Sequence, residues 1–162
     1  MKQLWIIDGH NVIHGRPELR DLLSKDPSGA LSQRQLIDDV HLLTDIAGDE
    51  VRVAFDSRHF KSLSEKWREK QKSTGIQVYF GSADEQADTL IERWVLAALE
   101  PDKINVVTND LAIRSLVEAA GAFSISISEF DERLRALIVV QQRKIERQNN
   151  RASGDFRNEI PL

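Results

Sequence analysis

Five short apolar runs, separated by long polar or amphipathic segments, restrict the folds open to this chain more than any other feature. The runs are four to six residues long and rich in Val, Ile and Phe, as is typical of strands buried in a parallel sheet. They are Leu4–Ile7, Val51–Asp56, Ile76–Phe80, Ile104–Thr108 and Phe123–Ile127.

The segments between these runs carry apolar residues at helical spacing. Strands that alternate with helices predict βαβ units, and therefore an α/β fold of three layers, α/β/α, around a mainly parallel five-stranded sheet. We expect a long helix to begin at a capping box over Ser128–Asp131 and to end near Asn149, followed by a disordered final dozen residues. The other expected helices cover Leu31–Ala47, about Ser62 to Ser73, Asp84–Glu100, and Asp110 to Ala120. The segment His14–Lys25 is expected to form either a short helix or a loop.

The length of 162 residues favours one domain with a single core. The chain has no cysteine, which excludes disulfides, thiolate metal sites and a cysteine nucleophile. The sequence shows neither a signal-peptide pattern nor an apolar run long enough to cross a bilayer, so we expect a cytoplasmic protein without a membrane partner. The oligomeric state is left open.

The net charge of −4 argues against nucleic acid as a partner, but the charge is unevenly distributed. Residues 57–73 hold six Lys or Arg against two Glu, and residues 133–157 hold seven against two acidic residues. Two basic segments on an acidic background suit a phosphate-bearing partner, while solvated helix faces are the alternative interpretation.

Three of the five runs lead directly into an aspartate, namely Asp8, Asp56 and Asp110. Strands of a parallel sheet point the same way, so these three carboxylates are expected to converge at the carboxyl edge of the sheet, where α/β proteins bind ligands. Asp88, in the first turns of its expected helix, belongs near the same edge, with Glu85 and Glu92 beside it. Each aspartate alone is equally well explained as a helix cap or turn residue.

Clustered carboxylates repel one another, and no cation adjacent in sequence offsets them. A bound divalent cation would offset the repulsion between these carboxylates. Oxygen ligands without His or Cys suit Mg²⁺ or Mn²⁺ rather than zinc. None of the four histidines has a supported metal-ligand spacing, and only His10 lies close enough to Asp8 to contact a substrate.

Four segments resemble the motifs of the NYN branch of PIN-like nucleases, and most closely those of the YacP-like group of bacterial NYN proteins. The segments are Ile7–Val12, Val53–Asp56, Ala87–Glu92 and Val107–Asp110. The resemblance covers about Lys2–Phe130, which suggests a nuclease domain over residues 1–130 and a C-terminal helix with a basic, partly disordered tail over 131–162.

The resemblance implies a Mg²⁺- or Mn²⁺-dependent endoribonuclease that cuts single-stranded RNA, in this group in association with translating ribosomes. By position, Asp8, Asp56, Asp88 and Asp110 match the acidic residues, and Asn11 and Thr108 match polar residues beside them. The carboxylates would hold the metal, with Glu85 and Glu92 as further candidates. Asn11 would orient a carboxylate or contact phosphate, and Thr108 would position the attacking water.

Phosphates repel an acidic site, so RNA binding would need basic residues at its flank. The candidates are Arg58, Lys61, Lys66 and Arg68. In the same segment, Trp67 is expected to anchor its helix in the core rather than to stack on a base. Two other functions stay open: a magnesium-dependent phosphohydrolase, which usually shows an Asp-x-Asp signature that this chain lacks at Asp8, and a non-catalytic adaptor that binds RNA or the ribosome.

Overall fold

The structure is a computed structural model that describes residues 2–56 and 64–159, with side chains described up to residue 153. Within these residues, the strands are β1 (Leu4–Asp8), β2 (Glu50–Phe55), β3 (Ile76–Phe80), β4 (Ile104–Val107) and β5 (Phe123–Ile125). The helices are α1 (Gly9–Gly15), α2 (Pro17–Lys25), α3 (Ala30–Asp45), α4 (Glu65–Lys72), α5 (Ala87–Leu96), α6 (Leu111–Ala119) and α7 (Ile127–Glu159), with a 3₁₀ turn over Pro101–Lys103.

The five strands form one sheet in the order β3-β2-β1-β4-β5, and every neighbouring pair is parallel. This confirms the α/β fold with a five-stranded sheet, and the sheet is parallel throughout. The central strand is β1, whose residues Trp5, Ile6 and Ile7 are almost completely buried because helices cover both faces.

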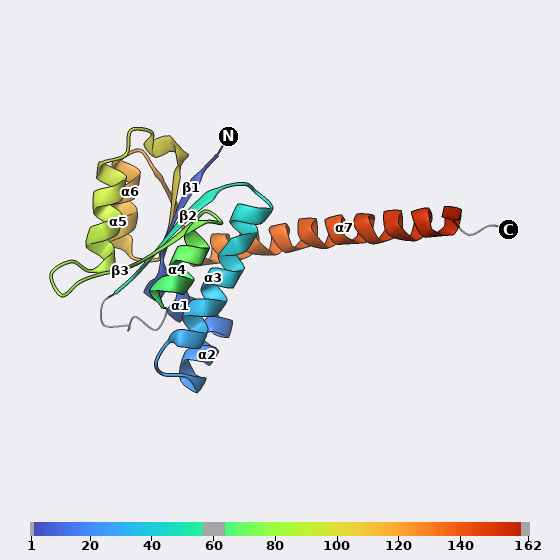
Figure 1. Ribbon diagram of the computed structural model, residues 1–162. Helices are drawn as coiled ribbons and strands as arrows, with labels where there is room; N and C mark the ends of the chain where they lie inside the picture. The colour runs from blue at the N-terminus through green and yellow to red at the C-terminus, as the bar shows by residue number, and fades with distance from the viewer. Residues whose placement is uncertain (1, 57–63, 160–162) are drawn as a thin grey trace.

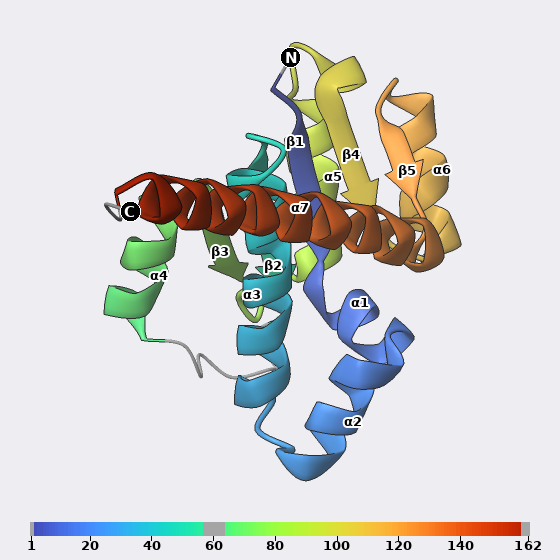
Figure 2. The same cartoon turned by 90° about the vertical axis from the view of Figure 1, so that its right-hand side faces the viewer.

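Helices cover both faces of the sheet in three layers (Figures 1 and 2). Two apolar clusters fill the spaces between these layers. On one face, side chains of α1, α2, α3 and α7 pack on Trp5 and Ile7, and Trp67 of α4 joins them as the anchor that the sequence predicted. On the other face, α5 and α6 pack on Ile6 and Val106 through their buried apolar residues. Ile6 and Ile7 enter opposite layers because successive side chains of a strand alternate.

The chain leaves β1 and β4 toward opposite faces of the sheet. After β1 it enters α1, which packs in the first cluster, and after β4 it enters α6, which packs in the second. Neighbouring parallel strands whose connections diverge in this way leave a crevice at their carboxyl ends, the usual ligand site of such sheets. Asp8 ends β1 beside this crevice.

The helix predicted over Asp84–Glu100 is shorter than expected at both ends, since α5 covers Ala87–Leu96. The backbone groups of Ser82 and Glu85 bond to each other and close a turn before the helix. At the other end Leu99, which falls within the predicted helix, is 99% exposed.

The start of the last helix also differs from the prediction. Helix α7 begins at Ile127, and the Oγ atom of Ser126 accepts from the Glu129 N–H group at 3.1 Å. The spacing Ser126-x-x-Glu129 matches a capping box better than the predicted Ser128–Asp131. Strand β5 ends at Ile125, two residues earlier than predicted, because this cap already starts the helix.

Helix α7 continues to Glu159, past the predicted end near Asn149, so the helix extends into the final dozen residues for which disorder was expected. Its first turns are buried through Phe130 and Leu134. Beyond them the helix leaves the body of the molecule and runs outward on its own (Figure 1). No helix in the described part of the chain is both long and apolar enough to span a membrane.

Candidate functional site

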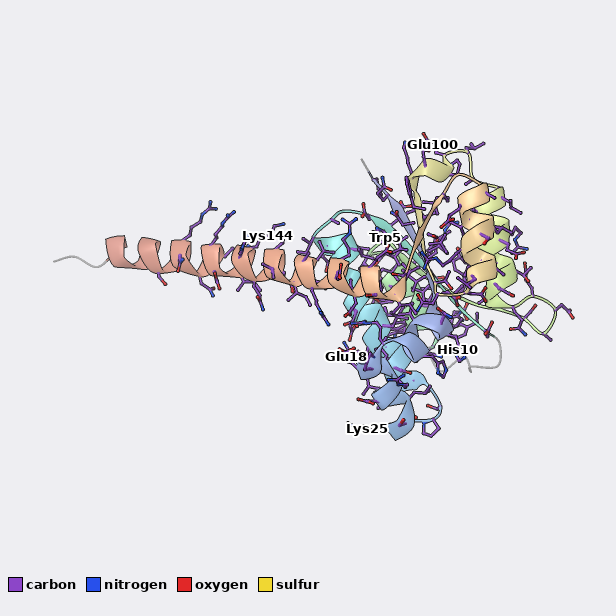
Figure 3. All side chains as sticks on the ribbon, turned by 180° about the vertical axis from the view of Figure 1, so that it is seen from behind. Trp5, His10, Glu18, Lys25, Glu100 and Lys144 are labelled. Atoms are coloured by element: carbon purple, nitrogen blue, oxygen red, sulfur yellow. The ribbon has the colours of Figure 1, made fainter. Side chains whose placement is uncertain are left out.

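A cavity of about 250 Å³ lies at the carboxyl edge of the sheet, where β1 and β4 diverge. All four predicted aspartates line it, although they come from four separate segments of the chain. Asn11 lines it as well, together with His10, whose position near this end of the molecule is marked in Figure 3. The remaining lining residues are Gln86, Ala87 and Ile113.

Asp8 is the buried carboxylate of this cavity, with 9% of its surface exposed. Its Oδ2 atom accepts a hydrogen bond from the Thr108 hydroxyl at 2.9 Å. Burial, helped by the neighbouring charges of Asp56 and Asp110, raises the pKa of Asp8 to about 6 against the opposing effect of the Thr108 bond. The site therefore holds the Asp8 anion at an energetic cost that a bound cation would offset.

Asp56 accepts a hydrogen bond from the first turn of α5, and Asp110 accepts two from the first turn of α6. Both helices cover the same face of the sheet. Oδ1 of Asp56 accepts from the Ala87 N–H group at 3.0 Å, and Oδ1 of Asp110 accepts from Ala112 and Ile113 at 2.9 and 3.2 Å. The helix dipoles favour a negative charge at these positions. Asp110 is the N-cap of α6 and thus has the capping role that the sequence offered as the alternative, whereas Asp56 bonds α5 from a distant segment of the chain. Both residues also line the cavity.

Asp88 is exposed in the first turn of α5, and its Oδ1 atom accepts from the Thr89 N–H group at 2.8 Å. This bond is local, so the position of Asp88 in the cavity depends on where α5 begins. The remote bond from Ala87 to Asp56 sets that start.

A chain of hydrogen bonds joins the segments around the cavity. Oδ1 of Asn11 accepts from the Asn109 N–H group at 2.7 Å, and Oδ1 of Asn109 accepts from Ile127 at 3.0 Å. The Thr108 hydroxyl also accepts from the Asp110 N–H group at 3.1 Å. Asn109 was not among the predicted site residues, although its place between Thr108 and Asp110 could have suggested this positioning role.

The structure does not bring Glu85 and Glu92 to this cavity. Glu85 lies in the turn before α5 and forms an ion pair with Arg93. Glu92 lines a separate shallow hollow with Thr89 and Arg93. The predicted position of Glu85 assumed a helix that already began at Asp84, whereas α5 begins at Ala87. Glu92 does lie in α5, but one turn further along the helix than Asp88.

The predicted RNA-binding residues divide into two pairs. Arg58 and Lys61 lie outside the described residues. Lys66 is exposed on α4, and Arg68 is half-buried with its guanidinium carbon 5.5 Å from the centre of the Phe80 ring. Both described residues lie beside β3, the strand at the edge of the sheet.

The donors that this cavity offers are those of a hard divalent cation: four carboxylates and an amide. In the described part of the chain, no three His, Asp or Glu side chains come close enough together to hold one ion jointly. Mg²⁺ usually takes only one or two carboxylates and keeps several waters, so the donor set fits an ion bound in that manner.

The parallel order β3-β2-β1-β4-β5 and the aspartates at its crevice define an α/β protein with an acidic site at the carboxyl edge of its sheet. The chain belongs to the family of YacP-like NYN domains, whose model matches residues 5–161. NYN domains are generally nucleases.

Similarities to individual proteins support this family assignment. The uncharacterized protein YacP of Bacillus subtilis (strain 168) is 28% identical over 151 residues, which cover 93% of this chain and 83% of that protein. The crystal structure of Rae1 (YacP) from Bacillus subtilis superposes with a TM-score of 0.74 at 26% identity, covering 98% of this chain and 85% of the other. A tryptophan-to-leucine mutant of Rae1 gives a TM-score of 0.71 at 24% identity, covering 95% and 85%, which supports the shared fold.

Proposed function

We propose that this protein is a Mg²⁺- or Mn²⁺-dependent endoribonuclease that hydrolyses phosphodiester bonds in single-stranded RNA. One observation carries the proposal: four aspartates from distant segments line one cavity at the crevice of a nuclease-like fold. Membership of the YacP-like family supports it. As partners we propose RNA and, by the same resemblance, the ribosome.

A bound divalent cation supplies Lewis acidity and lowers the pKa of a water bound to it. The chain's own residues prepare the site for this chemistry. Asp8, fixed by Thr108, provides a buried anionic oxygen, and Asp56, Asp88 and Asp110 add carboxylates around it. Asn11 lines the same cavity, and its amide N–H group suits a phosphate oxygen.

The role of Thr108 is better described as positioning than as handling water. Its hydroxyl donates to Asp8 and accepts from the Asp110 N–H group, so both aspartates depend on this one side chain. Thr108 is fully buried, which keeps the two bonds away from competing water. It orients the carboxylate rather than the attacking water.

A non-catalytic adaptor on RNA is the second candidate, and one observation favours it. The described residues contain no group of three acidic or histidine side chains arranged to hold an ion jointly. An adaptor would bind RNA equally well with EDTA and would leave it uncut.

The test is incubation of end-labelled single-stranded RNA with the protein under Mg²⁺, Mn²⁺ or EDTA, with the cut ends mapped. We expect cleavage that EDTA abolishes, and a loss of at least about a hundredfold in Asp8→Asn and Asp88→Asn. Asp38→Asn is the matched control, since Asp38 is exposed on α3, away from the cavity. Undiminished cleavage by both site variants, or binding without cleavage by the wild type, would overturn the proposal.

A further inference from the structure

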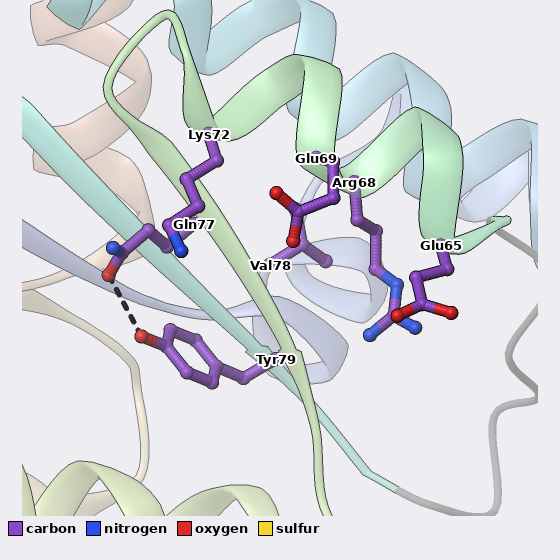
Figure 4. Close-up of a pocket in the computed structure, with 7 residues that line it drawn as sticks. All are labelled: Glu65, Arg68, Glu69, Lys72, Gln77, Val78 and Tyr79. Atoms are coloured by element: carbon purple, nitrogen blue, oxygen red, sulfur yellow. Dashed lines mark hydrogen bonds between the residues drawn. The ribbon is translucent and has the colours of Figure 1, made fainter.

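A second cavity, of about 240 Å³, lies between α4 and the edge strand β3 and is separate from the acidic cavity (Figure 4). Four charged side chains of α4 form one wall, at positions i, i+3, i+4 and i+7 of the helix, and residues of β3 form the other. The α4 side chains are Glu65, Arg68, Glu69 and Lys72. Because two are anionic and two are cationic, the wall offers hydrogen-bond acceptors and donors without a net charge.

The backbone of β3 adds a donor and an acceptor to this cavity. In a parallel strand, alternate residues direct their backbone groups toward a given neighbour. Gly75 and Gly81 both bond to β2, through the Gly75 carbonyl and the Gly81 N–H group. The register places Val78, which lines the cavity, among the alternate residues whose N–H and C=O groups point away from β2 to the open edge.

Arg68 brings a polar group that the described part of the chain leaves unsatisfied. Its Nε atom is buried and has no hydrogen-bond partner within the described residues. An unsatisfied buried donor costs free energy, so it marks a place where a ligand acceptor would bind favourably. The guanidinium lies over the Phe80 ring, which holds its planar donor edge in place.

The second cavity lies close to the acidic one. Phe80 pairs with Phe55 across β2 and β3, Asp56 follows Phe55, and Tyr79 precedes Phe80. From the strand spacing and rise, the backbone of Tyr79 lies about 8 Å from that of Asp56. If an RNA strand is cut at the acidic cavity, a nucleotide close to the cleaved bond in the same strand would therefore reach the second cavity.

We propose that this second cavity binds one nucleobase of the RNA substrate, with guanine preferred, and thereby sets where the strand is cut. The inference rests on the proposed function. Guanine presents the acceptors O6 and N7, which suit an arginine, and an amino group at N2, which suits a carboxylate. Arg68 supplies the first match, and Glu65 or Glu69 supplies the second.

Two other occupants fit the cavity less well. A phosphate group would meet two glutamates as well as the two cations, so it would gain little. A peptide strand added to β3 would need a continuous open edge, whereas the hollow is smaller than common small-molecule sites, which begin at about 300 Å³. A single base matches both the mixed charge and the size.

The test uses single-stranded RNAs that contain one guanosine in an otherwise adenosine strand, and matched RNAs with inosine or 7-deazaguanosine in its place. Inosine lacks the amino group at N2, and 7-deazaguanosine lacks N7. We expect wild-type cleavage near the guanosine to fall about tenfold with either analogue. In at least one of the variants Glu65→Gln and Glu69→Gln, replacing guanosine with inosine should no longer reduce cleavage. In Arg68→Lys, replacing guanosine with 7-deazaguanosine should no longer reduce it.

Glu18→Gln, an exposed substitution on α2, is the matched control and should keep the wild-type preference. Cleavage that ignores the base, or a guanine preference that survives in all three cavity variants, would overturn the inference while the nuclease activity stands. Absence of cleavage of any RNA would instead refute the proposed function. Anisotropy with the same RNAs then decides the inference by itself: a guanosine preference in binding supports the base site, and equal binding overturns it.

Discussion

Burial of the Asp8 carboxylate makes the stability of this protein depend on pH in a defined direction. The pKa of Asp8 is about 6 in the folded chain and 3.8 when unperturbed, so the folded state binds this proton more tightly. Below pH 3.8 the Asp8 carboxyl group is protonated in both states, so its burial does not lower the free energy of unfolding. As the pH rises from 3.8 through the folded pKa of about 6, the folded state progressively loses stability relative to the unfolded state, and the loss levels off at about 3 kcal/mol above that pKa.

Asp8→Asn removes this titration, so in EDTA we expect it to raise the free energy of unfolding at pH 8 by up to about 3 kcal/mol. At pH 4 the variant and the wild type should differ little. Urea unfolding from pH 4 to 8 measures the difference, with Asp38→Asn as the control that should follow the wild type. Parallel curves for Asp8→Asn and the wild type would contradict the raised pKa.

Thr108 holds two aspartates through one hydroxyl group, which allows a nearly isosteric test. Thr108→Val leaves the Asp8 oxygen and the Asp110 N–H group without this partner, so we expect a loss of about 1–3 kcal/mol in the free energy of unfolding. Thr108→Ser keeps the hydroxyl and should retain the metal dependence of cleavage. Chemical denaturation and cleavage at several Mn²⁺ concentrations compare the two, and equal behaviour would show that the hydroxyl is dispensable.

At the scale of elements, the loop between β3 and α5 controls where Asp88 lies. A Cβ atom added to Gly81 would lie 2.5 Å from the Glu85 carbonyl oxygen, which is backbone and cannot rotate away. The turn of Ser82–Glu85, and with it the start of α5, must therefore move.

We expect Gly81→Ala to cost about 1–3 kcal/mol of stability, as overpacking does, and to reduce RNA cleavage more than the loss of folded protein explains. Cleavage under conditions where circular dichroism shows the variant fully folded measures the second effect. Ala83→Ser, an exposed change in the same loop, is the control. Normal cleavage by folded Gly81→Ala would show that the loop does not position the site.

The strands could be predicted from the sequence because a buried parallel strand is a local apolar run, as Ile104–Val107 shows. Helix starts were harder to predict where the bonds that fix them are remote. The α5 start depends on a bond between Asp56 and Ala87, 31 residues apart, and Glu85 was misplaced for that reason. The role of Asn109 was missed for the same reason, because it bonds Asn11 and Ile127 at separations of 98 and 18 residues.

Across the whole molecule, α7 divides into a part that stabilises the body and a part that does not. Its first turns place Phe130 and Leu134 in the core, and Arg16 joins Asp131 of α7 to Asp39 of α3 by ion pairs of 3.1 and 2.7 Å. Phe130→Ala should therefore cost about 3–5 kcal/mol. Residues 142–153 of the distal part are exposed, so charge substitutions there should leave the unfolding midpoint unchanged.

The distal half of α7 instead contributes charge. Lys144, Arg147 and Arg151 are exposed at spacings of three and four residues, so they share one face of a helix that stands clear of the body (Figures 1 and 3). A row of cations there should add to the salt-dependent attraction of RNA, because each phosphate neutralised releases a counterion.

Replacing these three residues with Gln should weaken RNA binding and lower the slope of log affinity against log salt by up to about 2, from a contribution of roughly 0.7 per cation on a single strand. Anisotropy at several salt concentrations measures the slope. The matched control replaces Arg20, Lys25 and Arg34, which are exposed on α2 and α3 and change the net charge equally. A slope that falls equally in both triple variants would mean that RNA responds to the total charge of the protein, whereas a fall confined to the α7 variant places the RNA along this helix.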